Sequence, residues 1–217
     1  MEIINFADRP SLVSQYVMEL RDVKVQSDMM RFRRNLERIG EIMAYEISKT
    51  LKYDKVQVET PLAMADCLTP AEPIVLATIF RAGIPFHQGF LSYFDHAENA
   101  FVSAYRKYKE KENFDVFIEY IASPDLTGKT LILVDPMLAT GASMELSYRA
   151  LLTKGVPAKI HVCSAIASQA AVDYIARTFP ADKTTLWLAA VDPVINSHSY
   201  IVPGLGDAGD LCYGGKI

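Results

Sequence analysis

The fold of this chain is decided by the stretch Thr130-Leu131-Ile132-Leu133-Val134-Asp135-Pro136-Met137-Leu138-Ala139-Thr140-Gly141-Ala142-Ser143. An apolar, strand-like run ends at the carboxylate of Asp135, and a loop of small and hydroxyl residues leads into a helix-like pattern. A helix that begins after such a loop presents unpaired backbone N–H groups, which bind phosphate without a lysine. Asp135 can accept hydrogen bonds from sugar hydroxyls beside that phosphate. The stretch therefore predicts a site for a ribose 5-phosphate.

Apolar runs and helical patterns alternate on both sides of this stretch. The run 74–79 is continuously apolar and is followed by Arg81-Ala82-Gly83, so it is predicted to be a strand buried on both faces. The alternation predicts an α/β fold with a doubly wound, mainly parallel sheet flanked by helices. Further strands are predicted at residues 55–60, 101–105, 115–122, 130–135, 159–166 and 185–191, and helices at 11–20, 28–51, 84–93, 142–154 and 168–179.

Three charged residues follow or end predicted strands: Arg81, Arg106 and Asp135. Ligands of open parallel sheets bind at the carboxyl ends of the strands. We therefore expect these three side chains to point into one cleft.

Length, charge and cysteine content restrict the class of protein. The 217 residues suit one domain with a substantial core, and a net charge of −4 offers no basic surface for nucleic acid. The N-terminus lacks the pattern of a signal peptide, and the apolar runs are too short to cross a bilayer. Cys67, Cys163 and Cys212 are widely spaced, which is typical of reduced cysteines. These features predict a cytoplasmic enzyme.

A second informative stretch is Tyr200-Ile201-Val202-Pro203-Gly204-Leu205-Gly206-Asp207-Ala208-Gly209-Asp210. Three glycines and one proline in these eleven residues describe a backbone shaped for close approach to another group. It could read a flat base through its own N–H and C=O groups, or it could be a turn with solvated aspartates. The phosphate loop elsewhere in the chain favours the first interpretation.

Together the two stretches resemble the motifs of the uracil phosphoribosyltransferases. The first is similar to the phosphoribosyl diphosphate signature of type I phosphoribosyltransferases, and the second is specific to the uracil enzymes. The similarity continues in Arg81-Ala82-Gly83, Tyr105-Arg106 and Arg31-Phe32-Arg33. Ala142 stands where the family usually has a second glycine, and Leu211 where it usually has a basic residue. As the first residue of its helix, Ala142 should have ordinary helical dihedral angles and leave phosphate binding intact.

The resemblance implies a reaction and an architecture. Uracil and 5-phospho-α-ribosyl 1-diphosphate would give UMP and diphosphate. The fold would be the type I phosphoribosyltransferase fold in a single domain over residues 1–217. The core would cover about residues 70–195, and a small hood would be formed by residues 1–60, residues 196–217 and a β-hairpin arm.

The resemblance also implies the roles of individual residues. Arg81 and Arg106 would bind diphosphate, Asp135 the ribose hydroxyls, and Asp207 a magnesium ion through water, as hard cations prefer. Asp207, Arg106 and Asp135 would be the catalytic residues. The remaining substrate-binding residues would be Pro136, Met137, Leu138, Ala139, Thr140, Gly141, Ala142 and Ser143 around the phosphate, and Ile201, Gly206 and Ala208 around uracil.

Several alternatives stay open on the sequence. The cluster Arg31, Arg33, Arg34 and Arg38 could bind GTP as an effector, as in some relatives, or form a solvated or subunit-contacting helix face. The charged segment 107–113 is predicted as a loop, either a flap over the site or a hairpin tip. A homodimer or higher homo-oligomer is expected. The alternative function is a catalytically weak sensor of uracil or UMP. Such a sensor could also bind RNA, but the acidic net charge disfavours RNA binding.

Overall fold

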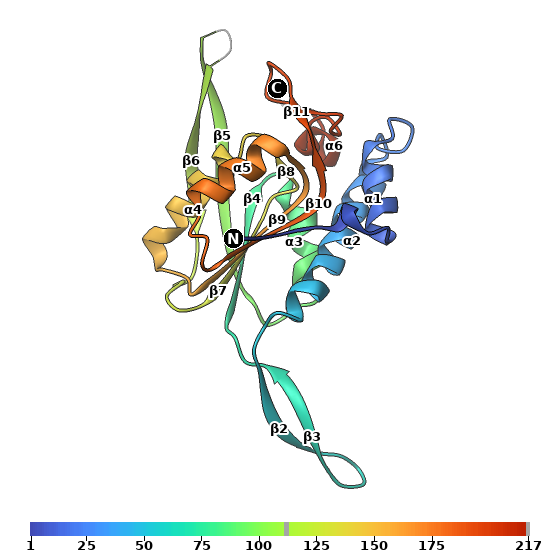
Figure 1. Cartoon of the computed structure of the whole chain (residues 1–217), viewed down its shortest axis with the longest axis vertical. Helices are drawn as coiled ribbons and strands as arrows, with labels where there is room; N and C mark the ends of the chain where they lie inside the picture. Colours follow the sequence, from blue (N-terminus) through green and yellow to red (C-terminus); the bar gives the residue numbers. More distant parts are fainter. Residues whose placement is uncertain (111–112, 216–217) are drawn as a thin grey trace.

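The structure is a computed structural model that describes residues 1–110 and 113–215, with side chains described outside residues 104–117. Its centre is an eight-stranded sheet (Figure 1). The strands run parallel except β6, which pairs antiparallel with β5. In spatial order the sheet contains β1 (Glu2–Asn5), β10 (Thr184–Asp192), β9 (Lys159–Ser168), β7 (Thr130–Val134), β4 (Ile74–Phe80), β5 (Glu98–Glu110) and β6 (Asn113–Ala122), with the short β8 (Met137–Leu138) paired to β9.

The stretch 130–143 supplies the middle strand of this sheet, β7. All five residues of β7 are buried, and the strand lies between β4 and β9, with Ile74 opposite Thr130 and Val134 opposite Cys163. Because successive side chains of a strand point to opposite faces, a central strand covered on both sides must be apolar throughout. The predicted mainly parallel α/β fold is confirmed.

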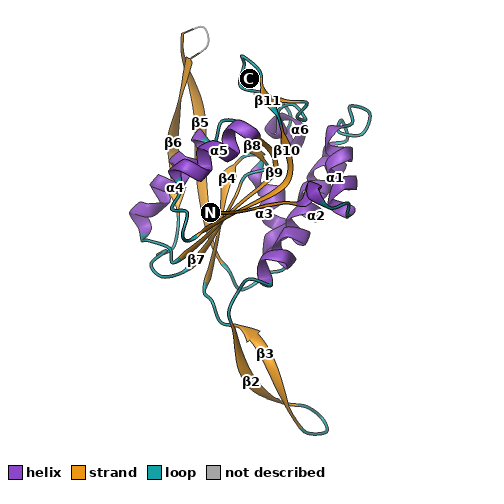
Figure 2. Cartoon of the chain, viewed as in Figure 1, coloured by secondary structure: helices purple, strands orange, loops and turns teal. Residues whose placement is uncertain are grey.

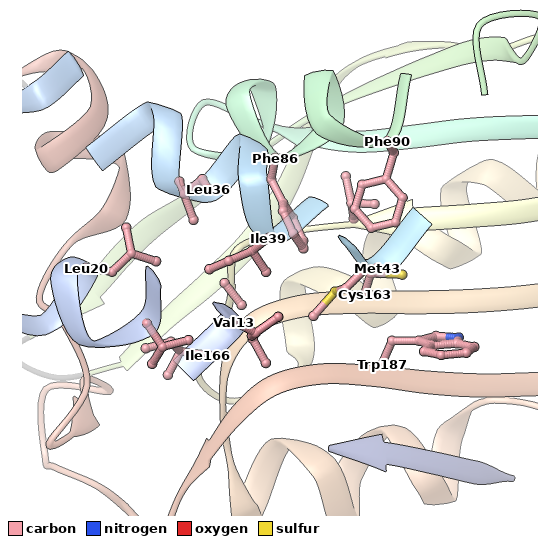
Figure 3. Packing of buried hydrophobic residues seen from close by; sticks show 14 of the residues in the cluster. Val13, Leu20, Leu36, Ile39, Met43, Phe86, Phe90, Cys163, Ile166 and Trp187 are labelled. Carbon is pink, nitrogen blue, oxygen red and sulfur yellow. The ribbon is translucent and has the colours of Figure 1, made fainter. Parts of the chain in front are cut away.

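Helices cover both faces of the sheet (Figure 2). On one face lie α1 (Leu12–Arg21), α2 (Met29–Ser48) and α3 (Gly83–Leu91); on the other lie α4 (Ala142–Leu151) and α5 (Gln169–Thr178). Each face buries its own apolar cluster. The larger cluster joins α1, α2 and α3 to the sheet through residues such as Leu36, Ile39, Phe86, Cys163 and Trp187 (Figure 3). This rigid three-layer frame holds the carboxyl ends of the strands in place.

Two antiparallel hairpins extend from the frame (Figure 1). One is formed by β2 (Tyr53–Glu59) and β3 (Met64–Pro70), which were predicted only as a single strand. The other is formed by β5 and β6, which pair as far as Glu110 and Asn113. The predicted loop over residues 107–113 is therefore too long, since residues 107–110 belong to β5 and residue 113 to β6, but the alternative of a charged hairpin agrees with this pairing. Residues 111–112 lie outside the described part. Cross-strand pairing of the backbone, as between Lys107 and Asp115, extends the hairpin through this charged segment.

The N-terminal segment contributes directly to the sheet. β1 pairs in parallel with β10, with Glu2 opposite Thr185 and Asn5 opposite Leu188. Residues 1–5 carried no strand prediction, since four residues are too few to show a period. None of the helices within residues 1–110 and 113–215 combines the length and the apolar character needed to cross a bilayer.

Candidate active site at the carboxyl ends of the strands

A cavity of about 720 Å³ opens at the carboxyl ends of β4 and β7. This edge of a doubly wound sheet is where such folds bind their ligands. Segments distant in sequence contribute to it: the end of β4, Ser103 of β5, the loop between β7 and α4, and the glycine-rich C-terminal segment. Among described residues, its lining consists of Ile79, Phe80, Arg81, Ala82, Ser103, Asp135, Met137, Ala139, Ser143, Ser199, Tyr200, Gly206, Asp207, Ala208, Gly209 and Asp210.

The loop before α4 has the geometry of an anion site. Gly141 has φ +82°, and a Cβ added there would lie 2.8 Å from the Tyr174 ring, so this position requires glycine. Thr140 Oγ1 accepts from the Ala142 N–H at 3.3 Å, and Gly141 provides no side-chain cap for the helix. The next N–H groups, beginning at Ser143, have no acceptor within the first turn of the helix, and Ser143 lines the cavity. Ala142 begins α4 and has no positive φ, which confirms the prediction of helical dihedral angles.

Asp135 and the residues after it are held by β9. The Asp135 N–H donates to Cys163 O at 3.1 Å, and its Oδ1 accepts from the Met137 N–H at 3.3 Å. Residues 137–138 then pair with β9 as β8, a strand too short to be predicted. Asp135 and Met137 consequently line the cavity, whereas Pro136 and Leu138 are buried behind it.

Arg81 follows β4 and faces the C-terminal segment. Its Nη2 donates to Asp210 Oδ1 at 2.9 Å, and its buried Nε has no hydrogen-bond partner among the described residues. Both side chains of this pair are about 40% exposed (37% and 42%), so the pair is too solvated to be a strong structural contact. An unsatisfied guanidinium N–H at the wall of a cavity is suited to an anionic ligand.

The C-terminal segment forms the remaining wall. It comprises β11 (Val194–Ile195), β12 (Ile201–Val202) and α6 (Ala208–Tyr213), with Gly206, Asp207 and Ala208 in the lining. Asp207 is the N-cap of α6, and its Oδ1 accepts from the Asp210 N–H at 3.0 Å.

Ile201 lies behind the wall and is only 3% exposed. Asn196 and Tyr200 form a hydrogen-bonded pair, since the Asn196 N–H donates to Tyr200 O at 2.9 Å. Hydrogen-bonded and non-hydrogen-bonded pairs alternate along antiparallel strands, so the next pair, Ile195 and Ile201, is not hydrogen-bonded, and the N–H and C=O of Ile201 point away from Ile195. Those groups are therefore not used by β11.

The structure brings most of the predicted site residues together. In the lining are Arg81, Asp135, Met137, Ala139, Ser143, Gly206, Asp207 and Ala208. Outside the lining, in the same two loops, are the buried residues Pro136, Leu138, Gly141 and Ile201 and the half-buried residues Thr140 and Ala142. Arg106 belongs to β5 by its backbone, and its side chain lies outside the described part.

Ser199, Tyr200 and Asp210 line the cavity but were given no role from the sequence. Ser199 has φ +61°, unusual for a residue with a Cβ. Asp210 could have been found from its place in the glycine-rich stretch, because a carboxylate there repeats the chemistry of Asp207.

The cavity offers oxygen donors rather than a complete metal site. Asp135, Asp207 and Asp210 contribute carboxylates to its wall, and the described residues contain no group of three His, Cys, Asp or Glu side chains placed to hold a metal by themselves. Mg²⁺ commonly keeps several waters and binds one or two carboxylates together with substrate phosphates. The residues present therefore fit a magnesium ion that binds together with a diphosphate.

The cysteines take no part in this chemistry. Burial raises the pKa of the Cys212 thiol to about 12 and also raises the pKa of Cys163, so both are neutral, apolar core groups. All three cysteines are free, as the sequence predicted, and Cys67 is exposed on the β2–β3 hairpin.

Comparison with known proteins agrees with this geometry. The family model described as uracil phosphoribosyltransferase matches residues 8–215. A uracil phosphoribosyltransferase of Porphyromonas gingivalis is 64% identical over 217 residues, which is the full length of both chains. The structure of the AQ2163 protein from Aquifex aeolicus is similar with a TM-score of 0.85 and 29% identity, covering 98% of each chain. A hypoxanthine phosphoribosyltransferase of Staphylococcus aureus, at TM-score 0.50 and 12% identity, covers 75% of this chain and 76% of its own and shares the fold. The chain belongs to the uracil phosphoribosyltransferase family.

Proposed function

We propose that this chain transfers the phosphoribosyl group of 5-phospho-α-ribosyl 1-diphosphate to uracil, giving UMP and diphosphate. The observation that carries the proposal is one cavity that joins the loop before α4, through Ala139 and Ser143, with Arg81 and the glycine-rich segment 206–210. In the reaction a bond forms between uracil N1 and the anomeric carbon while the bond from that carbon to the diphosphate oxygen breaks. The N1 proton leaves uracil, and diphosphate leaves with the bonding electron pair.

The ribose 5-phosphate is assigned to the edge of the cavity at α4. Backbone N–H groups at the start of α4, with the hydroxyls of Thr140 and Ser143, would hold the phosphate. Asp135 lies at the end of the adjacent strand, where its carboxylate would accept hydrogen bonds from the ribose hydroxyls. With both the 5-phosphate and the ribose hydroxyls held, the anomeric carbon would be oriented toward the base. Such positioning of reactants contributes strongly to the rate of an enzymatic reaction.

Arg81 is assigned to the diphosphate, together with Arg106. The guanidinium fork matches phosphate oxygens and stabilises the charge that develops as the leaving group departs. The Arg81–Asp210 pair, 2.9 Å apart, lies at the cavity wall, where the diphosphate would take over part of the Arg81 hydrogen bonding. Magnesium would reduce the charge of the diphosphate, and Asp207 would hold that ion through water.

Uracil is assigned to the backbone of Ile201 and Gly206, with Asp207 and Ala208 completing the pocket. The expected location of the enzyme is the cytoplasm.

GTP as an effector stays a prediction that comes from the resemblance alone. The four arginines of α2 give it no further support, because each of them already contacts another group of the chain. Arg31 pairs with Glu19, Arg34 with Glu37 and Glu41, Arg33 donates to Cys212 O, and Arg38 contacts Asn35.

The decisive test is formation of UMP from uracil and phosphoribosyl diphosphate with magnesium. Cytosine, orotate, hypoxanthine and adenine serve as control bases. Rapid UMP formation with uracil alone supports the proposal. Binding of uracil or UMP without turnover would instead identify the chain as the weak sensor.

A bound anion provides a second prediction. In a structure with sulfate or UMP, phosphate or sulfate oxygens should lie about 2.7–3.2 Å from backbone nitrogens within residues 139–143. Ser143→Ala should weaken phosphoribosyl diphosphate binding by less than about tenfold, since it removes one neutral hydrogen bond. Gly141→Ala should weaken it much more, because φ +82° disfavours a Cβ there. An anion bound elsewhere, with this loop empty, would contradict the assignment.

The β2–β3 hairpin supports the expectation of a homo-oligomer. Every residue of β2 is exposed, and the directly opposite pairs Val56–Cys67 and Val58–Ala65 form one apolar face. The alternate pairs lie on the other face, which mixes charged, polar and apolar side chains: Tyr53–Pro70, Lys55–Leu68, Gln57–Asp66, joined by a hydrogen bond of 3.0 Å, and Glu59–Met64. An isolated two-stranded hairpin is marginally stable in water. We therefore propose that a second copy of the chain covers this apolar face.

Two lysine substitutions on neighbouring residues test this arrangement. Val58→Lys should shift the protein toward monomer in analytical ultracentrifugation, because a buried ammonium without a partner is costly. Gln57→Lys adds the same charge on the opposite face and should leave the assembly unchanged. Dissociation by both substitutions, or by neither, would show that the apolar face is not the interface.

A further inference from the structure

A buried ion pair lies behind the glycine-rich segment, where α1 and β10 end. Arg21 is the last residue of α1, and Asp192 is the last residue of β10. Nη1 and Nη2 of Arg21 each donate to one Asp192 carboxylate oxygen at 2.7 Å. Asp192 is 4% exposed and is the one carboxylate among the buried polar side chains of the described residues. Two parallel charged hydrogen bonds fix both the distance and the orientation of the partners.

The ion pair ends on the backbone of Gly204. Asp192 Oδ2 accepts from the Gly204 N–H at 2.9 Å, and Arg21 Nη1 donates to Gly204 O at 3.0 Å. Gly204 has φ +57°, and an added Cβ would lie 2.1 Å from Ile201 O. Both polar backbone groups of a residue that only glycine can occupy are thus held by one pair of side chains.

Gln26 extends the same attachment by one residue. Its Nε2 donates to Leu205 O at 3.2 Å and to Leu20 O at 2.8 Å. The next residue along the chain, Gly206, already lines the cavity. Three side chains, two from the N-terminal segment and one from β10, therefore hold the backbone up to the point where it becomes the wall of the site.

We propose that Arg21 and Asp192, assisted by Gln26, are positioning residues for the pyrimidine base, an inference that rests on the proposed function. None of the three lines the cavity, so they act through Gly204 and Leu205. A side chain can adjust to a bound base by changing its rotamer, but a backbone N–H or C=O group cannot. If backbone groups bind the base, the whole segment that carries them must therefore be held in place. Misplacement of a binding group by about 1 Å is enough to lose most of its effect.

Steady-state kinetics of matched variants test the inference. Arg21→Lys keeps the charge but loses the fork, and it should raise the KM for uracil about tenfold or more. Gln26→Leu leaves the ion pair intact and removes the hydrogen bonds to Leu20 O and Leu205 O. Because only the second of these reaches the base segment, the variant should raise the KM for uracil about fivefold, the size expected for one neutral hydrogen bond. The KM for phosphoribosyl diphosphate should stay within about twofold in both, since its loops are held by other contacts.

Thr130→Val is the control for a general loss of stability. It removes a buried hydrogen bond of 2.7 Å to Glu72 at the other end of the sheet, and neither KM should change. If Arg21→Lys does not fold, Gln26→Leu decides the question. Equal changes in both KM values, or unchanged KM for uracil in both variants of an active enzyme, would overturn the inference. Absence of UMP formation by the wild type would overturn the proposed function itself, before any variant is compared.

Discussion

Asp207→Asn should lower turnover about tenfold to a thousandfold while the fold stays intact, which is the range for one electrostatic contact made in the transition state. The substitution keeps the shape of the side chain and removes the charge assigned to magnesium and diphosphate. Its structural role survives, because Asp207 Oδ1 caps α6 by accepting from the Asp210 N–H, and asparagine is an equally good N-cap. Charge and cap are therefore separable at this position.

The measurement is kcat at saturating magnesium and substrates, with thermal unfolding recorded alongside. Asp207→Ala is the informative companion, since it removes the charge and the cap together and should additionally cost about 1 kcal/mol of stability. A matched distant substitution is Asp182→Asn, which neutralises a carboxylate outside the cavity and should leave kcat unchanged. Wild-type kcat in Asp207→Asn would count decisively against the assigned role.

Discrimination between uracil and cytosine should survive substitutions of the apolar side chains in the base segment. Uracil presents acceptor, donor and acceptor groups along one edge, whereas cytosine replaces the last acceptor with an amino group. Asp207 has the one polar side chain in residues 201–208 and is assigned to the metal, so backbone N–H and C=O groups must read the base. Cytosine would place an amino donor against a backbone N–H. Sites built on hydrogen bonds reject such analogues by roughly ten-thousandfold or more.

Val202→Ala and Leu205→Ala test this arrangement with different expected costs. Val202 is 42% exposed, so its truncation should change uracil kcat/KM little. Leu205 is 5% exposed and packs in the larger core cluster, so its truncation should cost about 2–5 kcal/mol of stability and weaken activity. Neither variant should use cytosine, because neither loses a reading group. Appreciable cytosine turnover in either would show that side chains, not the backbone, choose the base.

The strand, glycine turn and helix proposed to bind phosphate could be predicted from the sequence because their signals are local. An apolar run, a carboxylate, a glycine and a helical pattern follow one another within residues 130–143, and the strand, turn and helix form in that order. Ala142 has the helical conformation that its place after Gly141 requires. The charged segment at the tip of the β5–β6 hairpin was misjudged for a related reason. Polar composition is typical of loops, yet a pair of strands can also carry charged residues, because the pairing itself is made by backbone groups.

Contacts between distant segments were beyond sequence analysis. Arg81 pairs with Asp210 across 129 positions, and Arg21 pairs with Asp192 across 171. No periodicity in one segment indicates its partner in another, and four-residue or two-residue strands such as β1 and β8 are too short to show a period.

The sequence by itself determined the class of fold and the strand, glycine turn and helix of residues 130–151, and it gave the residues proposed for the phosphate, the sugar and the base. Periodicity, turn residues and motif composition depend on neighbours within a few positions, so they can be read along the chain. Only the tertiary structure decided which of those residues share a cavity, that Asp210 faces Arg81, and that Arg21 and Asp192 hold Gly204. These contacts form when the layers of helix and sheet pack, because burial of apolar faces brings together groups that the chain itself keeps far apart.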